Sequence, residues 1–257
     1  MLTVRVVKIG GNELDRPEWV AECARALRRA GPVVVVHGGG HAVSTWSRRL
    51  GLPVEKRDGM RVTTPEIAEI VEMVLGGPIN RLLVSALRAA GLDAIGLSGV
   101  DGGLLTAQPI ASPELGEVGE IVAVRGSLLQ SLLLAGLTPV IAPVAPSLTI
   151  PIRPLNVNAD QAAAAIAAAL GAEELLFVSD VPGFTVDGVA QPTLASAEIE
   201  PMIETGVATG GMAAKLRAAG HALQAGARAV RIGDLDMFEH ATAGTRLLTA
   251  PPAVQPA

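Results

Sequence analysis

The sequence predicts an α/β fold built on a mainly parallel central β-sheet. Short runs of β-branched apolar residues, such as Val33 to Val36, alternate with segments whose apolar residues recur at helical spacing. The first two of these runs each end in a glycine turn that precedes a helical segment. Strand, turn and helix, twice in succession, are typical of βαβ units, in which consecutive strands run parallel.

The predicted elements cover nearly the whole chain. We expect strands at Val4 to Ile9, Val33 to Val36, Ala94 to Leu97, Leu104 to Gln108, Val118 to Val124, Pro139 to Ala142, Leu175 to Val178, Ala229 to Ile232 and Thr245 to Leu248. We expect helices around Pro17 to Ala30, after Gly40 to about Leu50, from Thr64, from about Ile79 to Ala90, over Leu128 to Ala135, from Asp160 to near Gly171, and from Gly210.

Local signals justify these boundaries. Pro17 suits the first turn of a helix, and Gly31 suits its end. The sequence Thr64-Pro65-Glu66 combines a capping residue, a first-turn proline and an acid at the start of a helix. The two segments between residues 104 and 124 are short, extended and bounded by turns, which predicts a hairpin beside the main sheet. Pro143 to Pro154 is proline-rich and non-helical, and Pro251 to Ala257 is expected to form a loose tail.

The composition indicates a compact globule. Hydrophobic residues make up 49% of the 257-residue chain and charged residues 18%. Glycine, proline or a charge interrupts each apolar run before the ~18 to 20 residues that a membrane-spanning helix needs. No secretory signal is visible, and the single cysteine, Cys23, cannot form an internal disulfide. We therefore expect a cytoplasmic protein.

Charge and aromatic content argue against nucleic acid as the main partner. The formal net charge is −5, whereas binding to phosphate backbones needs a basic face. Aromatic residues are only 2%, so platforms for base stacking are scarce.

Four glycine-rich turns each follow a predicted strand: Gly10-Gly11, Gly38 to Gly40, Gly99 to Gly103, and Asp180 to Gly183. Because parallel strands end at one edge of the sheet, these turns should converge there. Their exposed backbone amides and the helix N-termini beside them suit phosphate oxygens. A single Gly-Gly pair is equally typical of a tight turn. The sequence contains neither the P-loop pattern nor Gly-x-Gly-x-x-Gly after His37.

The charged residues Lys8, Lys215 and Asp160 are the candidates for catalysis. Lys8 lies between Val7 and Ile9 in an apolar strand, where an unpaired lysine would be costly to bury. Lys215 follows Gly210-Gly211, and alone it would be an ordinary solvated residue. Two such ammonium groups could stabilise a transferring phosphoryl group.

Asp160 and His37 leave more than one interpretation open. Asp160 follows two asparagines at a helix start, so it either belongs to a capping cluster or orients the two lysines. His37 could act as a base, but a lone histidine at a strand end is more often a structural hydrogen-bonding residue.

Together, these residues resemble the amino acid kinase family, and within it the members that phosphorylate the side-chain carboxylate of N-acetyl-L-glutamate in arginine biosynthesis. The blocks that carry the resemblance are Lys8-Ile9-Gly10-Gly11, Val36-His37-Gly38-Gly39-Gly40, Asp58-Gly59-Met60-Arg61-Val62-Thr63, Asn156-Val157-Asn158-Ala159-Asp160, Ser179-Asp180-Val181-Pro182-Gly183, and Gly210-Gly211-Met212 with Lys215. They follow the order of the family. The resemblance implies a three-layer αβα sandwich with an open, mainly parallel sheet.

The resemblance also implies roles. Lys8 and Lys215 would stabilise the phosphoryl group while Asp160 orients both. The acceptor would contact Gly39 and Gly40, with Arg61 on its α-carboxylate and Asn156 on its acetylamido group. The residues implied for ATP are Gly10, Gly11, Asp180, Val181, Pro182, Gly183, Phe184, Thr185, Val207, Ala208 and Thr209. Mg²⁺ would be carried mainly by the ATP phosphates, with no metal site of the chain's own.

The resemblance further implies an acceptor-binding and dimerising lobe at residues 1–171 and an ATP-binding lobe at 172–257. Members of the family that are hexameric and inhibited by arginine carry an N-terminal helix, whereas this sequence begins three residues before its first predicted strand. The resemblance therefore implies a homodimer that arginine does not inhibit. Thr64 stands where family members often have an acid, and Ile150 to Pro154 replaces a segment that usually contains glycine.

Two alternatives remain open. One is a related kinase whose aminoadipate or glutamate acceptor is held on a carrier protein, as in some lysine pathways. Such an enzyme needs a basic mouth, and only Arg57 and Arg61 lie beside the predicted acceptor loop. The other is a non-catalytic nucleotide-binding sensor of the same fold, against which the presence of Lys8, Asp160 and Lys215 together argues.

Overall fold

The computed structural model of the chain describes residues 3–57, 59–149 and 153–249. Asp58, most of the Ile150 to Pro154 segment and the predicted tail from Pro251 lie outside the described residues.

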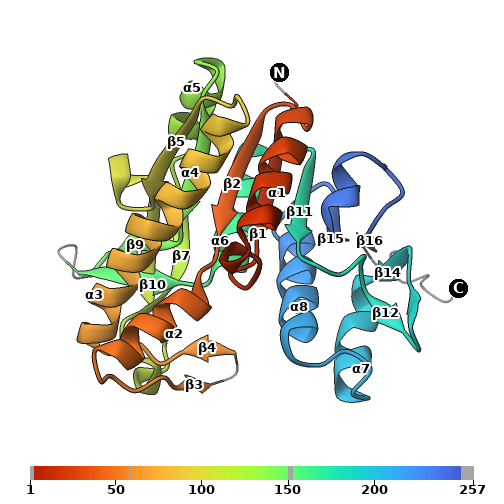
Figure 1. Ribbon diagram of the computed structural model, residues 1–257. Coiled ribbons are helices and arrows are strands. Elements are labelled where there is room, and N and C mark those ends of the chain that lie inside the picture. The colour runs from red at the N-terminus through yellow and green to blue at the C-terminus, as the bar shows by residue number, and fades with distance from the viewer. Residues whose placement is uncertain (1–2, 58, 150–152, 250–257) are drawn as a thin grey trace, which may run out of the picture.

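An eight-stranded sheet forms the centre of the molecule and confirms the predicted α/β class. Its strands are β1 (Arg5–Ile9), β2 (Val33–His37), β5 (Ala94–Ser98), β8 (Thr138–Ala142), β11 (Glu174–Val178), β14 (Thr193–Ala195), β15 (Val230–Gly233) and β16 (Thr245–Leu248). They lie in the order β14-β16-β15-β11-β1-β2-β8-β5. The β15–β16 pair is antiparallel, and the other neighbouring pairs are parallel. The strands β1, β2 and β11 therefore end at one edge of the sheet (Figure 1).

Helices cover both faces of this sheet, giving the expected three layers (Figure 1). The longer helices are α1 (Pro17–Arg29), α2 (Gly40–Arg49), α3 (Pro65–Val74), α4 (Asn80–Ala89), α5 (Gly126–Leu134), α6 (Ala159–Leu170), α7 (Ile199–Glu204) and α8 (Gly210–Gln224). Short 3₁₀ turns are η1 (Glu13–Asp15), η3 (Asp101–Gly103), η4 (Pro113–Leu115), η5 (Ser196–Glu198) and η6 (Leu235–Phe238).

Alternate residues of the central strands supply two separate cores. Val6 of β1 packs into the core beneath α5, α6 and α8, whereas Val7 packs into the core beneath α1, α3 and α4. This alternation follows from the two-residue period of a strand, and burial of both faces explains why the strands are apolar throughout. Lys8 therefore points to the face of the sheet that α6 and α8 cover.

A second sheet of four strands lies beside the first, in the order β6-β7-β10-β9. Its strands are β6 (Leu105–Pro109), β7 (Val118–Val124), β9 (Val144–Pro146) and β10 (Pro154–Val157). The β6–β7 pair is antiparallel, which confirms the predicted hairpin. The sequence did not suggest β9 within the proline-rich segment. The remaining strands form two small hairpins, β3 (Lys56–Arg57) with β4 (Met60–Arg61), and β12 (Thr185–Val186) with β13 (Val189–Ala190).

The two helices expected around residues 64–90 are present as α3 and α4, which follow one another directly and meet at a kink. Thr64 caps α3, as predicted, by accepting a hydrogen bond from the Ile67 amide at 3.3 Å. A π-helical segment, η2 (Leu75–Ile79), leads from α3 into α4, and the backbone of Gly77 departs from helical geometry at the kink. The joined helix Pro65–Ala89 is long and apolar enough to span a membrane, and half of its most apolar stretch is buried inside the protein. That half packs against the central sheet as a core helix.

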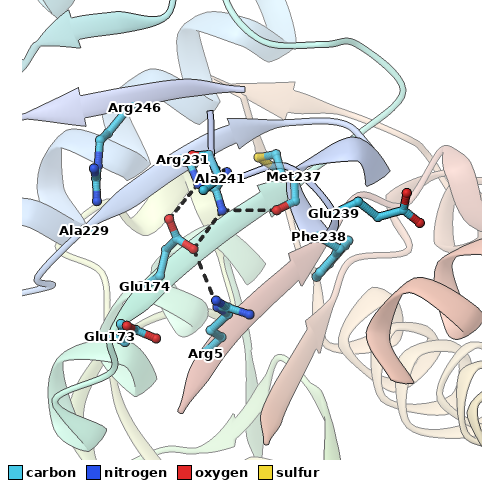
Figure 2. Close-up of a pocket in the computed structure, with 10 residues that line it drawn as sticks. All are labelled: Arg5, Glu173, Glu174, Ala229, Arg231, Met237, Phe238, Glu239, Ala241 and Arg246. Atoms are coloured by element: carbon cyan, nitrogen blue, oxygen red, sulfur yellow. Dashed lines mark hydrogen bonds and ion pairs between the residues drawn. The ribbon is translucent and has the colours of Figure 1, made fainter. Parts of the chain in front are cut away.

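A buried ion pair closes the opposite edge of the sheet, where the strands begin (Figure 2). Arg231 donates to both carboxylate oxygens of Glu174, at 2.6 and 2.9 Å. Its remaining hydrogen bonds go to backbone carbonyls of the segment that leads to β16, at Met237, His240, Ala241 and Ala243. A hollow of about 340 Å³ borders this pair. Arg231 thus ties β11 to the C-terminal strand pair.

Candidate active site

The glycine turns after β1 and β2 meet at the edge where these strands end. The Gly38 amide donates to the Ile9 carbonyl at 3.0 Å, which holds the two turns side by side. A Cβ added at Gly11 would lie 2.7 Å from the Gly39 nitrogen. The predicted convergence of these two turns is therefore confirmed, and it needs glycine because the opposing atoms belong to the backbone.

This close approach makes Gly11→Ala a test of the turn geometry. The alanine methyl group would push the two turns apart, and a displacement of about 1 Å in an active site can cost about 10²-fold in rate. We expect kcat/KM to fall by about that factor. The control is Gly76→Ala, where an added Cβ meets nothing within 4 Å. Equal activity of the two variants would contradict the requirement for close turns.

Lys8 is buried, with 7% of its surface exposed, and it is paired. Its Nζ lies 2.8 Å from Oδ1 of Asp160, in the first turn of α6. The helix itself is capped by Asn158, whose side-chain oxygen accepts from the Asp160 and Gln161 amides. Because Asn158 supplies the cap, the Asp160 carboxylate is free to neutralise Lys8, which favours the orienting interpretation over capping.

Lys215 lies in the second turn of α8, within the electrostatic reach of this pair. Burial lowers the pKa of the Lys215 ammonium below its ordinary value, and the positive charge of Lys8 lowers it further. The carboxylates of Glu13, Asp160 and Asp180 act on this pKa in the opposite direction. Asp160 thus forms a direct ion pair with Lys8. It affects Lys215 only by a longer-range electrostatic attraction, since no Lys215 ion pair occurs among the described residues.

Glu13 is the residue of this cluster that the sequence analysis missed. It lies in η1, directly after the Gly10-Gly11 turn, and only 4% of its surface is exposed. Its Oε2 would be 2.2 Å from a Cβ at Gly10, so the carboxylate occupies the space that a side chain there would fill. The printed sequence gives no sign of this burial, because an acid in a turn is normally solvated.

Arg61 is buried beside the start of α2 with an unused donor. Its Nη2 donates to the Gly40 carbonyl and to the Ser44 hydroxyl, both at 2.7 Å. Its Nη1 is buried and has no hydrogen-bond partner among the described residues. Burial, followed by the charge of Arg48, lowers the pKa of the Arg61 guanidinium below its ordinary value. A buried guanidinium with a free donor fits a carboxylate ligand, which it can bind in a planar, two-pronged manner.

A short hydrogen-bonded chain connects Arg61 with Asn156. The Thr63 hydroxyl donates to the Arg61 carbonyl at 2.8 Å, and the Asn156 side-chain amide donates to the Thr63 hydroxyl at 3.1 Å. Asn156 lies on β10, so the second sheet supplies this side chain to the site. The structure therefore places Gly40, Arg61 and Asn156 in one neighbourhood.

His37 is a structural residue. It is fully buried, and burial lowers its pKa to about 4, so the ring is neutral. Its Nδ1 contacts the Gly38 carbonyl at 2.9 Å, and its Nε2 lies 3.2 Å from the Asn80 side-chain amide. The ring fixes the start of the Gly38 to Gly40 turn, which favours the hydrogen-bonding interpretation over a catalytic base.

The residues expected to bind ATP differ in their exposure. Asp180 is about half exposed and lies 3.6 Å from Arg16, while Pro182, Thr185, Val207 and Thr209 are exposed. Val181 is partly buried, and Gly183 and Ala208 are buried. Phe184 lies in the core and its amide donates to the Thr245 hydroxyl, so its side chain faces away from any nucleotide. Only its backbone can contribute to a nucleotide site.

The N-terminus of α8 is open. Thr209 makes no side-chain capping bond, and a Cβ added at Gly210 or Gly211 would meet nothing within 4 Å. Free amides at a helix N-terminus attract phosphate oxygens. Residues 3–57, 59–149 and 153–249 contain no group of three or more His, Cys, Asp or Glu side chains that could hold a metal ion.

Comparison with known proteins agrees with this geometry. The family model described as "Amino acid kinase family" matches residues 3–234. The chain belongs to the amino acid kinase family. Among curated relatives of this amino acid kinase, an acetylglutamate kinase from Chloroflexus aurantiacus is 49% identical over 238 residues, covering 91% of this chain and 93% of the relative. An acetylglutamate kinase from Geobacillus kaustophilus is 46% identical and covers 85% and 84% of the two chains.

Solved structures show the same fold. The protein smu.665 from Streptococcus mutans superposes with a TM-score of 0.82 at 27% identity, covering 98% of this amino acid kinase and all of that chain. Carbamate kinase from Giardia lamblia gives a TM-score of 0.69 at 16% identity, covering 96% and 98%. At 16% identity, the latter likeness is one of fold alone.

Proposed function

We propose that this amino acid kinase is an acetylglutamate kinase, which transfers the ATP γ-phosphoryl group to the side-chain carboxylate of N-acetyl-L-glutamate. The observation that carries this assignment is the 49% identity with a curated acetylglutamate kinase over 91% of the chain. The product is an acyl phosphate, and we place the reaction in arginine biosynthesis. The carrier-protein-linked kinase and the non-catalytic sensor are not favoured, because the curated relatives described above carry the acetylglutamate kinase name.

The acceptor would lie between the triglycine turn and the Arg61 to Asn156 chain. The free Nη1 of Arg61 supports binding of the α-carboxylate, and Asn156 would bind the acetylamido group. The Gly40 carbonyl accepts a hydrogen bond from Arg61, so the triglycine turn lies next to this acceptor site. The amides of Gly39 and Gly40 would then face the reacting carboxylate.

The nucleotide would lie on the other side of the phosphoryl group. Gly10 and Gly11 would offer amides to its phosphates, together with the open N-terminus of α8. The segments 180–185 and 207–209 would bind the remaining nucleotide.

The chemistry needs charge stabilisation and alignment, with no general base. The acceptor carboxylate is ionised at neutral pH, because the ordinary pKa of such a group is about 4. One of its oxygens forms a bond to the γ-phosphorus as the bond from that phosphorus to the bridging oxygen breaks, and ADP leaves. Lys8 and Lys215 would neutralise the equatorial oxygens of the transferring group. The neutral, buried His37 agrees with this requirement.

Mg²⁺ fits this site as a companion of the nucleotide. The described residues offer no cluster of acidic ligands, so the phosphates would supply the main coordination. When bound, the ion supplies additional positive charge on the phosphates.

We also propose a homodimer in the cytoplasm, on the strength of the family resemblance. Sedimentation equilibrium should give a mass near twice that of one chain. A monomer or a hexamer would contradict the proposal.

The acceptor assignment is tested by trapping the product. The protein is incubated with MgATP and N-acetylglutamate in the presence of hydroxylamine, which converts an acyl phosphate to a hydroxamate. We expect hydroxamate with N-acetylglutamate but not with glutamate or aspartate. Trapping only with an unacetylated acceptor would move the assignment within the family. Binding of ATP without trapping from any acceptor would favour a sensor.

A further inference from the structure

The Glu13 carboxylate lies at the edge of the sheet where β1 ends, directly after the Gly10-Gly11 turn. Gly10 follows the last residue of β1 and is two residues beyond Lys8. Glu13 folds back into that space, with Oε2 pressed against Gly10. A carboxylate is therefore buried at the turn that the phosphate would approach, within the electrostatic reach of Lys215.

Among the described residues, no hydrogen-bond donor to Oε2 accounts for the burial of this carboxylate. Its Oε2 is buried and accepts no hydrogen bond from the described residues. On the neighbouring helix α1, the Cys23 thiol stays neutral, because burial and then the Glu13 charge raise its pKa to about 12. An ionised carboxylate is costly to bury unless a positive charge compensates it. Lys215 is a positive charge that interacts with it electrostatically.

We propose that Glu13 is a positioning residue, an internal counter-ion that keeps Lys215 charged and directed toward the phosphoryl-transfer site. The charged groups that act on Lys215 are Lys8 from β1, Asp160 from α6, Asp180 from the segment after β11, and Glu13 from η1. Asp160 is already committed to Lys8 at 2.8 Å, and Asp180 is about half exposed and therefore screened by water. Glu13 is the buried carboxylate of this set, and its Oε2 accepts no hydrogen bond from the described residues. The role of Glu13 in catalysis rests on the proposed kinase function.

The proposal is tested by the protonation of Lys215 itself. The chain contains three lysines, Lys8, Lys56 and Lys215, and Lys56 is exposed on β3. Trace labelling with acetic anhydride over a pH series, quantified by mass spectrometry of the lysine peptides, gives the protonation midpoint of Lys215 with Lys56 as an internal reference. In Glu13→Gln, which keeps the shape and removes the charge, we expect the Lys215 midpoint to fall by about one pH unit.

Two further variants test whether the Lys215 midpoint shifts in the direction that the removed charge predicts. Lys8→Met removes a like charge, so it should move the Lys215 midpoint upward. Glu22→Gln removes an exposed acid of α1 and should leave the midpoint unchanged. An unchanged Lys215 midpoint in Glu13→Gln would overturn the proposal. Should that variant fail to fold, Glu13→Asp retains the charge at a greater distance, and the same downward shift, smaller in size, is required.

A kinetic measurement separates positioning from a structural role. Because Lys215 must be protonated to stabilise the phosphoryl group, kcat should fall as pH rises through its pKa. In Glu13→Gln this alkaline limb should move to lower pH, in step with the labelling midpoint, while thermal stability is retained. Loss of stability with an unmoved limb would contradict the proposal. The labelling experiment needs no acceptor, so its result is valid even if the enzyme phosphorylates another substrate. The role proposed for Glu13 and the proposed kinase function can therefore be contradicted independently.

Discussion

Replacing Lys8 with arginine is expected to lower kcat about 10²- to 10³-fold while ATP binding stays nearly intact. The variant keeps the positive charge and can still pair with Asp160, now 2.8 Å from the lysine Nζ. The guanidinium is planar and larger, so it cannot occupy the compact position from which an ammonium meets the transferring phosphoryl group. Loss of one preorganised charge at a transition state typically has an effect of this size.

Steady-state kinetics and calorimetric titration with ATP measure the two quantities. The matched control is Lys56→Arg on the exposed β3 hairpin, which should retain wild-type kcat. Near-normal turnover of the Lys8 variant would remove Lys8 from the mechanism.

Replacing Arg231 with methionine is expected to lower the free energy of unfolding by about 3–5 kcal/mol. The substitution leaves Glu174 buried without its bidentate partner. It also removes the donors that hold the backbone carbonyls of Met237 and Ala243. The pair (Figure 2) lies where the strands begin, whereas Lys8 lies near the other end of β1, so kcat of the folded variant should change little.

Urea-induced unfolding measures this difference. The control is Arg88→Met, which removes an exposed pair with Asp93 and should cost less than about 1 kcal/mol. In the double variant Arg231→Met with Glu174→Leu, part of the loss should be recovered because no buried charge remains. An Arg231 variant as stable as the control would show that the pair does not hold the C-terminal strands.

Much of the fold follows from local patterns. The apolar runs of β1, β2, β8 and β11 lie within a residue or two of their predicted positions, because strands buried on both faces must be apolar throughout. The helices on either side of Gly76 and Pro78 were predicted, but the π-helical segment that joins them was not. Leu75 and Ile79 of this segment lie against Gly39 of the triglycine turn, a long-range contact that no local pattern reveals.

The candidate site was partly predictable. Lys8 could be found because a lysine within an apolar strand needs a partner, and Asp160 is that partner. The same reasoning could have identified Arg231, which stands between Val230 and Ile232. The division into lobes at residue 171 stays a prediction.

Other features depend on long-range packing. Glu13 resembles any turn residue in the sequence, and its burial results from the absence of a side chain at Gly10. Phe184 lies within a predicted nucleotide segment, yet it faces the core because its amide is held by Thr245, 61 residues later.

The joint action of Lys8 and Lys215 is tested most directly by a crystal structure with MgADP, N-acetylglutamate and aluminium fluoride, a mimic of the transferring phosphoryl group. We predict that the Nζ atoms of both lysines lie within about 3 Å of the fluoride ligands. Either ammonium directed away from the aluminium fluoride would contradict the proposed mechanism.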